Sequence, residues 1–226
     1  MGENAVAPPH ATPPAELKAS MIYQGGRVIC RVFCVQWFDL KVYGLEHVPR
    51  SGGVLIVSNH QSYLDPVVLG AKTPRALSFL AKSELFEVPG FSWLIRKLNA
   101  FPVRQGEGDV GAVRETIRRL QEGHALNVFP EGTRSEDGEI APTLPGVGLI
   151  ARRAGVPVVP AVIVGSFQAW PRGKTLFHPH PVRVQFGPAM NLQGLKSAQI
   201  VQTIDETLRK MFADLRERVR REGIKA

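Results

Sequence analysis

The chain has 226 residues and a mass of 24.8 kDa, enough for one domain with a full hydrophobic core. Hydrophobic residues make up 44% and charged residues 21%, a composition that excludes a disordered or fibrous protein. With two cysteines and no Cys/His group at zinc-ligand spacing, a disulfide scaffold and a zinc module are excluded as well. Lys and Arg number 28 against 20 Asp and Glu, so the net charge of +8 favours an anionic partner: nucleic acid, acidic lipid or a phosphorylated substrate.

The N-terminal region divides into a tail and a helix. Residues 1–16 are rich in Pro and Ala and are predicted to be a disordered tail. They lack the blocks of a signal peptide, and no stretch of the chain reaches the roughly 18 apolar residues of a spanning helix. Residues 17–39 are predicted to form an amphipathic helix with Arg27 and Arg31 on a basic edge. Such a helix either lies in a membrane interface or packs on the domain's own core, and the pattern favours neither.

The rest of the chain, residues 40–222, alternates between strand-like and helix-like segments. The apolar runs predict strands, the periodic runs at three- and four-residue spacing predict helices, and no repeat is visible. This alternation is typical of a single α/β domain with a mostly parallel central sheet flanked by helices. The expected strands are 40–48, 52–58, 76–81, 124–129, 156–164 and 182–187, and the expected long helices are 109–122 and 198–221.

A histidine and an aspartate follow the apolar strand at 52–58. His60 comes just past the strand's carboxyl end, the edge where open α/β sheets bind ligands. Asp65 precedes Pro66 and is a natural N-cap for a helix that begins there. A strand–loop–helix turn can bring the Asp65 carboxylate to one nitrogen of His60, leaving the other nitrogen free as a general base. A plain cap and a surface histidine are the alternative interpretation.

A second polar loop follows the strand at 124–129. It reads Phe-Pro-Glu-Gly-Thr-Arg-Ser over residues 129–135, where Gly132 permits a tight backbone approach and Arg134 offers a planar fork for a phosphate. Glu131 either binds a substrate hydroxyl or pairs with an arginine to hold the loop. Lys82 directly follows the predicted strand at 76–81, and Arg104 ends the short extended segment Phe101–Arg104. Together these cations and the histidine indicate a pocket for a phosphate monoester whose hydroxyl reaches the base.

Four sequence blocks, which follow one another along the chain, resemble those of the glycerolipid acyltransferases, specifically the bacterial 1-acyl-glycerol-3-phosphate (lysophosphatidic acid) acyltransferases. The resemblance runs from about residue 20 to about residue 215, over Asn59–Asp65 with its His-x4-Asp, Phe101–Arg104, Phe129–Ser135 and Val156–Pro160. It implies the fold of the glycerol-3-phosphate acyltransferases. It also implies an O-acyltransferase that moves a fatty acyl group from acyl-CoA or acyl carrier protein to the hydroxyl of 1-acyl-sn-glycerol-3-phosphate, giving phosphatidic acid.

The resemblance also assigns roles to residues. His60 is implied as the general base and Asp65 as its orienting partner. The implied acceptor-binding residues are Lys82, Arg104, Glu131, Gly132, Thr133 and Arg134. The Val156–Pro160 block is implied for the donor side or for packing, and a buried strand explains it equally well. Leu144 stands where many members carry a lysine, so another lysolipid, such as a lyso-ornithine lipid, is the natural variant acceptor.

The predicted partners are a lysophospholipid, an acyl thioester and a membrane surface, with no metal and no cofactor. A peripheral or monotopic location at the cytoplasmic face of the cell membrane is expected. The alternatives are a non-catalytic phospholipid-binding protein of the same fold and a thioesterase that uses water as acceptor. Nucleic-acid binding is disfavoured, because no recognised motif is present and aromatic residues make up only 8%.

Overall fold

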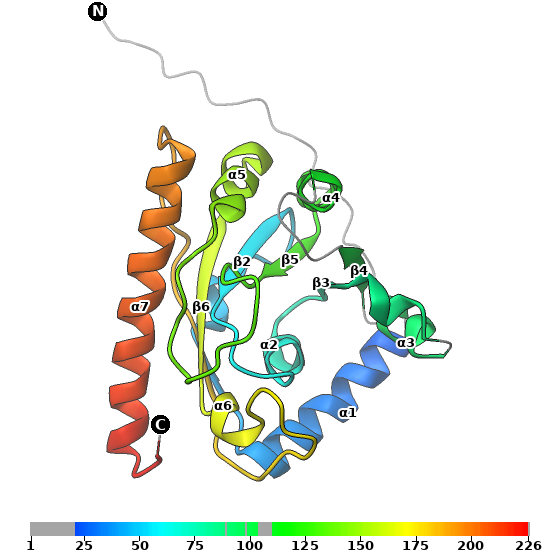
Figure 1. The fold of residues 1–226 in the computed structure, drawn as a ribbon, viewed down its shortest axis with the longest axis vertical. Coiled ribbons are helices and arrows are strands. Elements are labelled where there is room, and N and C mark those ends of the chain that lie inside the picture. The colour runs from blue at the N-terminus through cyan, green and yellow to red at the C-terminus, as the bar shows by residue number, and fades with distance from the viewer. Residues whose placement is uncertain (1–20, 89, 98, 104–109, 226) are drawn as a thin grey trace, which may run out of the picture.

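The structure is a computed structural model that describes residues 21–88, 90–97, 99–103 and 110–225 (Figure 1). The predicted tail at 1–16 and Arg104 lie outside the described residues. In chain order the elements are α1 (Met21–Phe38), β1 (Lys41–Tyr43), η1 (Leu45–His47), β2 (Val54–Ser58), α2 (Asp65–Lys72), β3 (Leu77–Lys82), η2 (Ser83–Phe86), α3 (Phe91–Lys97), β4 (Ala100–Val103), α4 (Val110–Gln121), β5 (Ala125–Val128), α5 (Pro145–Ala154), β6 (Val158–Val164), α6 (Ser166–Ala169), β7 (Arg183–Phe186) and α7 (Ser197–Arg221).

The centre of the fold is a seven-stranded sheet in the order β1-β7-β6-β2-β5-β3-β4. Every pairing is parallel except β6 with β7, which is antiparallel. The predicted α/β class and mostly parallel sheet are therefore confirmed. Because β2, β3, β4, β5 and β6 run the same way, the loops that follow them leave from one edge of the sheet.

Helices cover both faces of the sheet, and the strands alternate their side chains between the two layers. On β2, Val54 and Ile56 face the core beneath α1 and α2, whereas Leu55 and Val57 face the core beneath α4, α5 and α7. All five residues of β2 are buried, as are all seven of β6, which explains why both read as continuous apolar runs. In Figure 1 the long helix α7 lies on one side of the sheet and α1 on the other.

Helix α1 packs on the domain and also exposes an apolar face. Tyr23, Cys34 and Phe38 are buried, and the Tyr23 hydroxyl accepts the Leu77 N–H at 3.0 Å. Apolar side chains on the outward face are at least one-third exposed; they are Met21, Val28, Ile29, Val32, Phe33, Val35 and Trp37. The interpretation as a helix packed on the domain's own core is confirmed for the buried face, while the role of the exposed apolar face stays a prediction. Arg27, predicted to lie on the basic edge of this helix, is half-buried, and its Nη1 donates a hydrogen bond to the Thr73 carbonyl at 3.0 Å.

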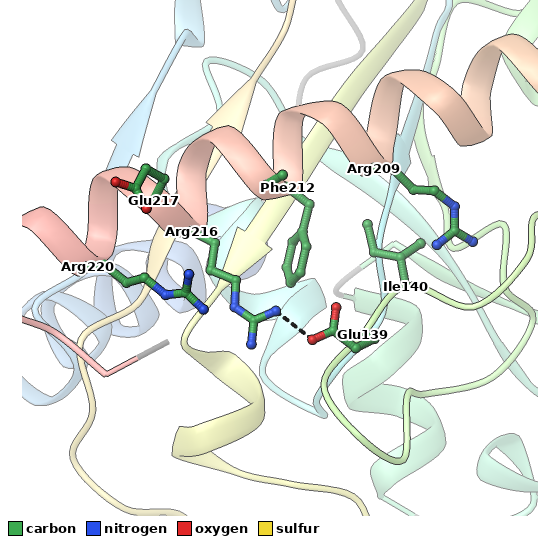
Figure 2. A pocket seen from close by; sticks show the side chains of 8 residues that line it. Glu139, Ile140, Arg209, Phe212, Arg216, Glu217 and Arg220 are labelled. Atoms are coloured by element: carbon green, nitrogen blue, oxygen red, sulfur yellow. Dashed lines mark hydrogen bonds and ion pairs between the residues drawn. The ribbon is translucent and has the colours of Figure 1, made fainter.

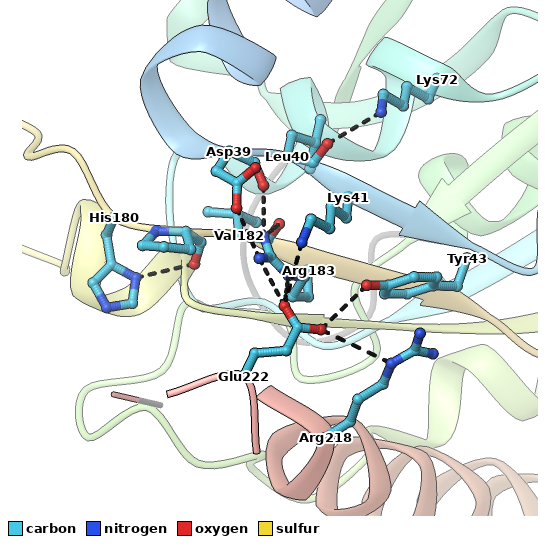
Figure 3. A network of polar contacts seen from close by, with 11 residues as sticks. Asp39, Leu40, Lys41, Tyr43, Lys72, His180, Val182, Arg183, Arg218 and Glu222 are labelled. Carbon is cyan, nitrogen blue, oxygen red and sulfur yellow. Dashed lines mark hydrogen bonds and ion pairs between the residues drawn. The ribbon is translucent and has the colours of Figure 1, made fainter. Parts of the chain in front are cut away.

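A buried arginine joins the chain ends of the domain (Figure 3). Arg183 on β7 is 1% exposed, and its guanidinium donates to Asp39, after α1, and to Glu222, after α7. The carboxylate of Glu222 also lies 3.6 Å from the Lys41 ammonium. Burial acts to raise the pKa of Glu222, but the hydrogen bonds from Arg183 and the positive charges of Arg183 and Lys41 outweigh it and hold that pKa below its ordinary value. This network fixes α1 and α7 against the β7 side of the sheet.

The structure differs from the sequence-based prediction at several elements. The segment 40–48 is a three-residue strand, because Gly44 adopts φ +72° and η1 follows it. Three helices, α3, α5 and the four-residue α6, were not predicted; α5 begins at Pro145 and ends at Ala154, followed by Gly155 with φ +65°. The predicted strands 52–58, 76–81, 124–129, 156–164 and 182–187 correspond to β2, β3, β5, β6 and β7, and the predicted long helices to α4 and α7.

Candidate active site

The loops after β2 and β5 meet at the carboxyl edge of the sheet, because these strands are parallel neighbours with Val57 opposite Val128. His60 lies in the first loop, and Glu131 to Ser135 form the second. The peptide unit of His60 is held from both sides by that second loop. Its N–H donates to Glu131 Oε1 at 2.6 Å, and its carbonyl accepts the Ser135 N–H at 2.8 Å. The sequence-predicted residues His60 and Glu131, 71 positions apart in the chain, are thus brought together.

The His60 ring is oriented by a carboxylate and by an aromatic ring. Its Nδ1 lies 2.8 Å from Asp65 Oδ2, and the ring stacks on Phe129 with centroids 3.8 Å apart and planes 14° from parallel. The His60 side chain is 18% exposed while that of Asp65 is fully buried. A carboxylate at Nδ1 selects the tautomer that carries its proton there, so Nε2 presents a lone pair. The predicted contact between His60 and Asp65 is present in the structure.

Asp65 holds the loop rather than capping the helix. It is the first residue of α2, and its Oδ2 accepts the N–H groups of Gln61 at 2.6 Å and Ser62 at 2.7 Å, both of which precede it. An N-cap side chain would instead accept an N–H from the first turn that follows it. The N-cap interpretation is therefore replaced by a tight carboxylate-centred turn that carries His60. Its other oxygen, Oδ1, is buried without a hydrogen-bond partner among the described residues.

Both oxygens of Glu131 are used by the backbone. Oε1 accepts the His60 N–H, and Oε2 accepts the Ala141 N–H at 2.8 Å, while the residue is 6% exposed. No arginine forms an ion pair with it within the described part of the chain. Burial raises the pKa of Glu131 to about 7, an effect that the two N–H groups oppose. The geometry therefore gives Glu131 a bracing role that neither of the two sequence-based alternatives anticipated.

The turn at Gly132 places Thr133 and Arg134 at the surface edge of the second loop. Gly132 has φ +71°, a backbone conformation that favours glycine, and a β-carbon there would also displace the Leu144 side chain. Gly132 and Thr133 are exposed. Leu144 lies beside this turn, 51% exposed, and its N–H donates to the Pro130 carbonyl. The residue that departs from the family pattern is thus adjacent to the predicted acceptor-binding loop.

Arg134 stacks on a tyrosine from the first loop. The central carbon of its guanidinium lies 3.5 Å from the centroid of the Tyr63 ring, and Tyr63 in turn contacts Trp170 at 5.2 Å. Nη1 of Arg134 is buried and has no hydrogen-bond partner in the part of the chain that the structure describes. An arginine held by a ring, with a donor unused, is a fitting site for an anion such as a phosphate. Sequence reasoning missed Tyr63 and Phe129 as support for these residues, although both lie inside the blocks it singled out.

Of the two other predicted cations, Lys82 and Arg104, only Lys82 lies within the described residues. Lys82 ends β3, two strands from β2 in the sheet, and its backbone pairs with Val103 of β4. Arg104, the next residue after Val103, lies outside the described residues. Lys82 falls at the carboxyl edge where His60 lies, because β3 is parallel to β5.

A separate groove lies beside α7 and contains none of the predicted site residues (Figure 2). Phe212 and Ile140 line this groove, and Arg216 forms an ion pair with Glu139 there. Arg209, also in this groove, pairs with Asp205 of its own helix. No three His, Cys, Asp or Glu side chains gather as a metal site would require in the described ranges. None of the helices in these ranges has the length and apolar content needed to span a bilayer.

Comparison with known proteins gives a consistent result. The family model described as Acyltransferase matches residues 39–164. A 1-acyl-sn-glycerol-3-phosphate acyltransferase of Bacillus subtilis is 28% identical over 80% of this chain and 89% of its own length. A chloroplastic protein of that name from Brassica napus is 31% identical over 61% of this chain, which spans only 40% of that relative. The crystal structure of the 1-acyl-sn-glycerophosphate acyltransferase from Thermotoga maritima superposes with a TM-score of 0.72 at 31% identity, over 86% of this chain and 78% of that one.

Proposed function

Since the chain belongs to the Acyltransferase family, we propose that it transfers a fatty acyl group from a thioester to the free hydroxyl of 1-acyl-sn-glycerol-3-phosphate, giving phosphatidic acid. The observation that carries the proposal is the His60–Asp65 pair at 2.8 Å, with Arg134 stacked nearby on Tyr63, three residues after His60. One group supplies a base for a hydroxyl, and the other a site for a phosphate. A lysophosphatidic acid carries both functional groups.

The proposed chemistry is direct attack without an acyl-enzyme. His60 Nε2 takes the proton of the acceptor hydroxyl while the hydroxyl oxygen forms a bond to the thioester carbonyl carbon. The π electrons of that carbonyl move onto the carbonyl oxygen. The tetrahedral oxyanion then collapses, the C–S bond breaks, and the leaving thiolate takes the proton from the imidazolium. Asp65 remains a carboxylate and stabilises that imidazolium. The route uses no metal and no cofactor, and the donor is acyl-CoA or acyl carrier protein.

The acceptor's phosphate is proposed to bind Arg134, with Gly132 and Thr133 presenting the turn beside it. Lys82 and Arg104 are proposed to complete the cationic side of the pocket; Lys82 ends β3 at the carboxyl edge of the sheet. Glu131 contributes by holding the His60 backbone. A direct contact between Glu131 and the acceptor stays a prediction. Both carboxylate oxygens of Glu131 already accept backbone N–H groups.

The exposed face of α1 is proposed to lie in the membrane interface, at the cytoplasmic face of the membrane. It presents Ile29 and Val32, 71% and 57% exposed, together with the ring of Trp37. Apolar groups of this kind on a helix beside a basic domain bind the boundary between headgroups and acyl chains. Both the acceptor and the product reside in that layer, so this placement brings the substrate to the enzyme.

The test is product analysis with purified protein, lysophosphatidic acid and a radiolabelled palmitoyl thioester. Labelled phosphatidic acid that forms only when the acceptor is present supports the proposal. Labelled free fatty acid, formed with or without acceptor, would identify a thioesterase and overturn it. The same assay with a lysolipid that lacks the phosphate, such as a lyso-ornithine lipid, tests the head group; a faster reaction there would make that lipid the acceptor and would agree with Leu144 in place of a lysine.

A further inference from the structure

An uninterrupted series of aromatic contacts runs from Arg134 to the exposed face of α1. Arg134 lies on Tyr63, Tyr63 contacts Trp170 with centroids 5.2 Å apart, and Trp170 contacts Phe177 at 5.6 Å. Phe177 then meets Phe33 at 5.8 Å and Trp37 at 6.2 Å, both on α1. We call Tyr63, Trp170, Phe177, Phe33 and Trp37 the aromatic seam.

The rings of the seam are only partly covered. Tyr63 is 53% exposed, Trp37 46% and Phe33 39%, and neighbouring Leu176 is 71% exposed. Trp170 and its loop are fixed by two hydrogen bonds: Ser62 Oγ donates to the Trp170 carbonyl, and Trp170 Nε1 donates to the Lys174 carbonyl, each at 2.8 Å. The rings of the aromatic seam are therefore held in place by the fold and form one continuous apolar surface.

The two ends of the seam differ in chemistry. At one end the buried Nη1 of Arg134 has no hydrogen-bond partner among the residues described. At the other end the seam joins the apolar face of α1 that Val28, Ile29 and Val32 continue. A ligand that matches this sequence of surfaces carries an anion at one end and a long apolar chain at the other.

Resting on the proposed function, we infer that the aromatic seam is the subsite for the acyl chain that the acceptor already carries. With its phosphate on Arg134, the monoacyl lipid lays that chain across Tyr63, Trp170 and Phe177 toward α1 and the bilayer. Charge complementarity at Arg134 selects this occupant over the chain of the thioester donor, whose carbonyl must reach His60. The seam therefore makes the enzyme prefer long-chain lysolipids over short-chain phosphate monoesters of glycerol.

A single-tryptophan protein gives a direct test. The chain has three tryptophans, so the double variant Trp37→Phe/Trp93→Phe leaves Trp170 as the reporter and keeps a ring at position 37. Lysophosphatidic acid brominated along its acyl chain is expected to quench the Trp170 fluorescence saturably, and Arg134→Ala in the same background should shift the midpoint about tenfold higher. The absence of quenching would overturn the inference. Equal quenching by a brominated acyl thioester, or by a brominated monoacylglycerol at the same concentration, would also overturn it.

Kinetics provide the second measurement. In the full chain, Trp170→Ala is expected to raise the KM for a palmitoyl acceptor about tenfold and to leave the KM for a hexanoyl acceptor nearly unchanged. Trp170→Phe keeps the ring and should restore the palmitoyl KM, which a merely structural role of the Nε1 hydrogen bond would not. Trp93→Ala, on α3 and 56% exposed, is the matched control. Equal KM increases for both acceptors would contradict the inference.

The two proposals fail in different ways. If the unmodified protein makes no phosphatidic acid, the proposed reaction is wrong, and the fluorescence measurement still reports whether a phosphate-bearing monoacyl lipid occupies the seam. If phosphatidic acid forms but Trp170 is not quenched and the Trp170→Ala acceptor profile is unchanged, the reaction stands and the seam is not its acyl-chain subsite.

Discussion

The carboxylate of Glu131 accepts the backbone N–H of His60 at 2.6 Å, so the loop after β5 holds the main chain of the candidate base. The same loop donates the Ser135 N–H to the His60 carbonyl. Two sequence blocks that the family pattern describes separately are thus one hydrogen-bonded unit. The position of the His60 ring depends on Asp65 and Phe129, and the position of its backbone depends on Glu131 and Ser135.

Glu131 gives a prediction about pH. Its pKa is about 7 in the folded protein against 4.5 ordinarily, so between these values the folded protein binds more protons here than the unfolded chain. The contribution of Glu131 to folding is thus largest below about pH 4.5 and declines as pH rises through about 7. The stability of the unmodified protein relative to Glu131→Gln should therefore fall from pH 5 to 8, by up to about 3 kcal/mol in urea titrations. Parallel stability curves for the two proteins would contradict it.

Asp65 is predicted to matter for stability as well as for activity. Asp65→Ala removes the acceptor for His60 Nδ1 and for the Gln61 and Ser62 N–H groups at a fully buried position. Unpaired buried donors are costly, so we expect a loss of about 3 kcal/mol in the free energy of unfolding. Denaturant unfolding measures this, with His60→Ala as the control that removes only one of the three donors. A loss below about 1 kcal/mol would show that the turn is held by other contacts.

The exposed face of α1 predicts membrane binding that a small change removes. Deleting the helix would remove Cys34 and Phe38 from the core, so charged substitutions are the cleaner test. Ile29→Glu/Val32→Glu should weaken sedimentation with anionic liposomes more than about tenfold, because two charges enter the apolar layer. Gln24→Glu/Gln36→Glu adds the same charge at polar positions of the same helix. Equal sedimentation of both double variants would place the membrane contact elsewhere.

The Arg183 network predicts unequal losses for its members. Arg183→Ala leaves the Glu222 carboxylate without its buried partner and should cost about 3 kcal/mol of stability. Asp39→Ala should cost under about 1 kcal/mol, because the Asp39 side chain is 61% exposed and well solvated. Thermal unfolding of the two variants measures the difference. Similar losses from both would mean that Asp39 carries more of the contact than its exposure indicates.

The sheet was predictable where strands are buried on both faces. β2 and β6 are continuous apolar runs for that reason, and a polar loop after each parallel strand must reach one edge. The helix α5 was not predictable from apolar runs, because its short sequence includes two glycines and two arginines. The contact of His60 with Asp65 followed from local spacing. The roles of Glu131 toward His60 and of Trp170 toward Tyr63 did not, since each joins segments that only the tertiary fold brings together.

The central claim is that His60 is the base that activates the acceptor hydroxyl. The most direct measurement is the rate of phosphatidic acid formation by His60→Ala at saturating lysophosphatidic acid and thioester, beside the unmodified protein. We predict a fall in kcat of at least about a hundredfold. The free energy of unfolding should change by under about 1 kcal/mol, because the His60 side chain lies at the site and is partly exposed. A folded variant that keeps a near-normal kcat would contradict the claim.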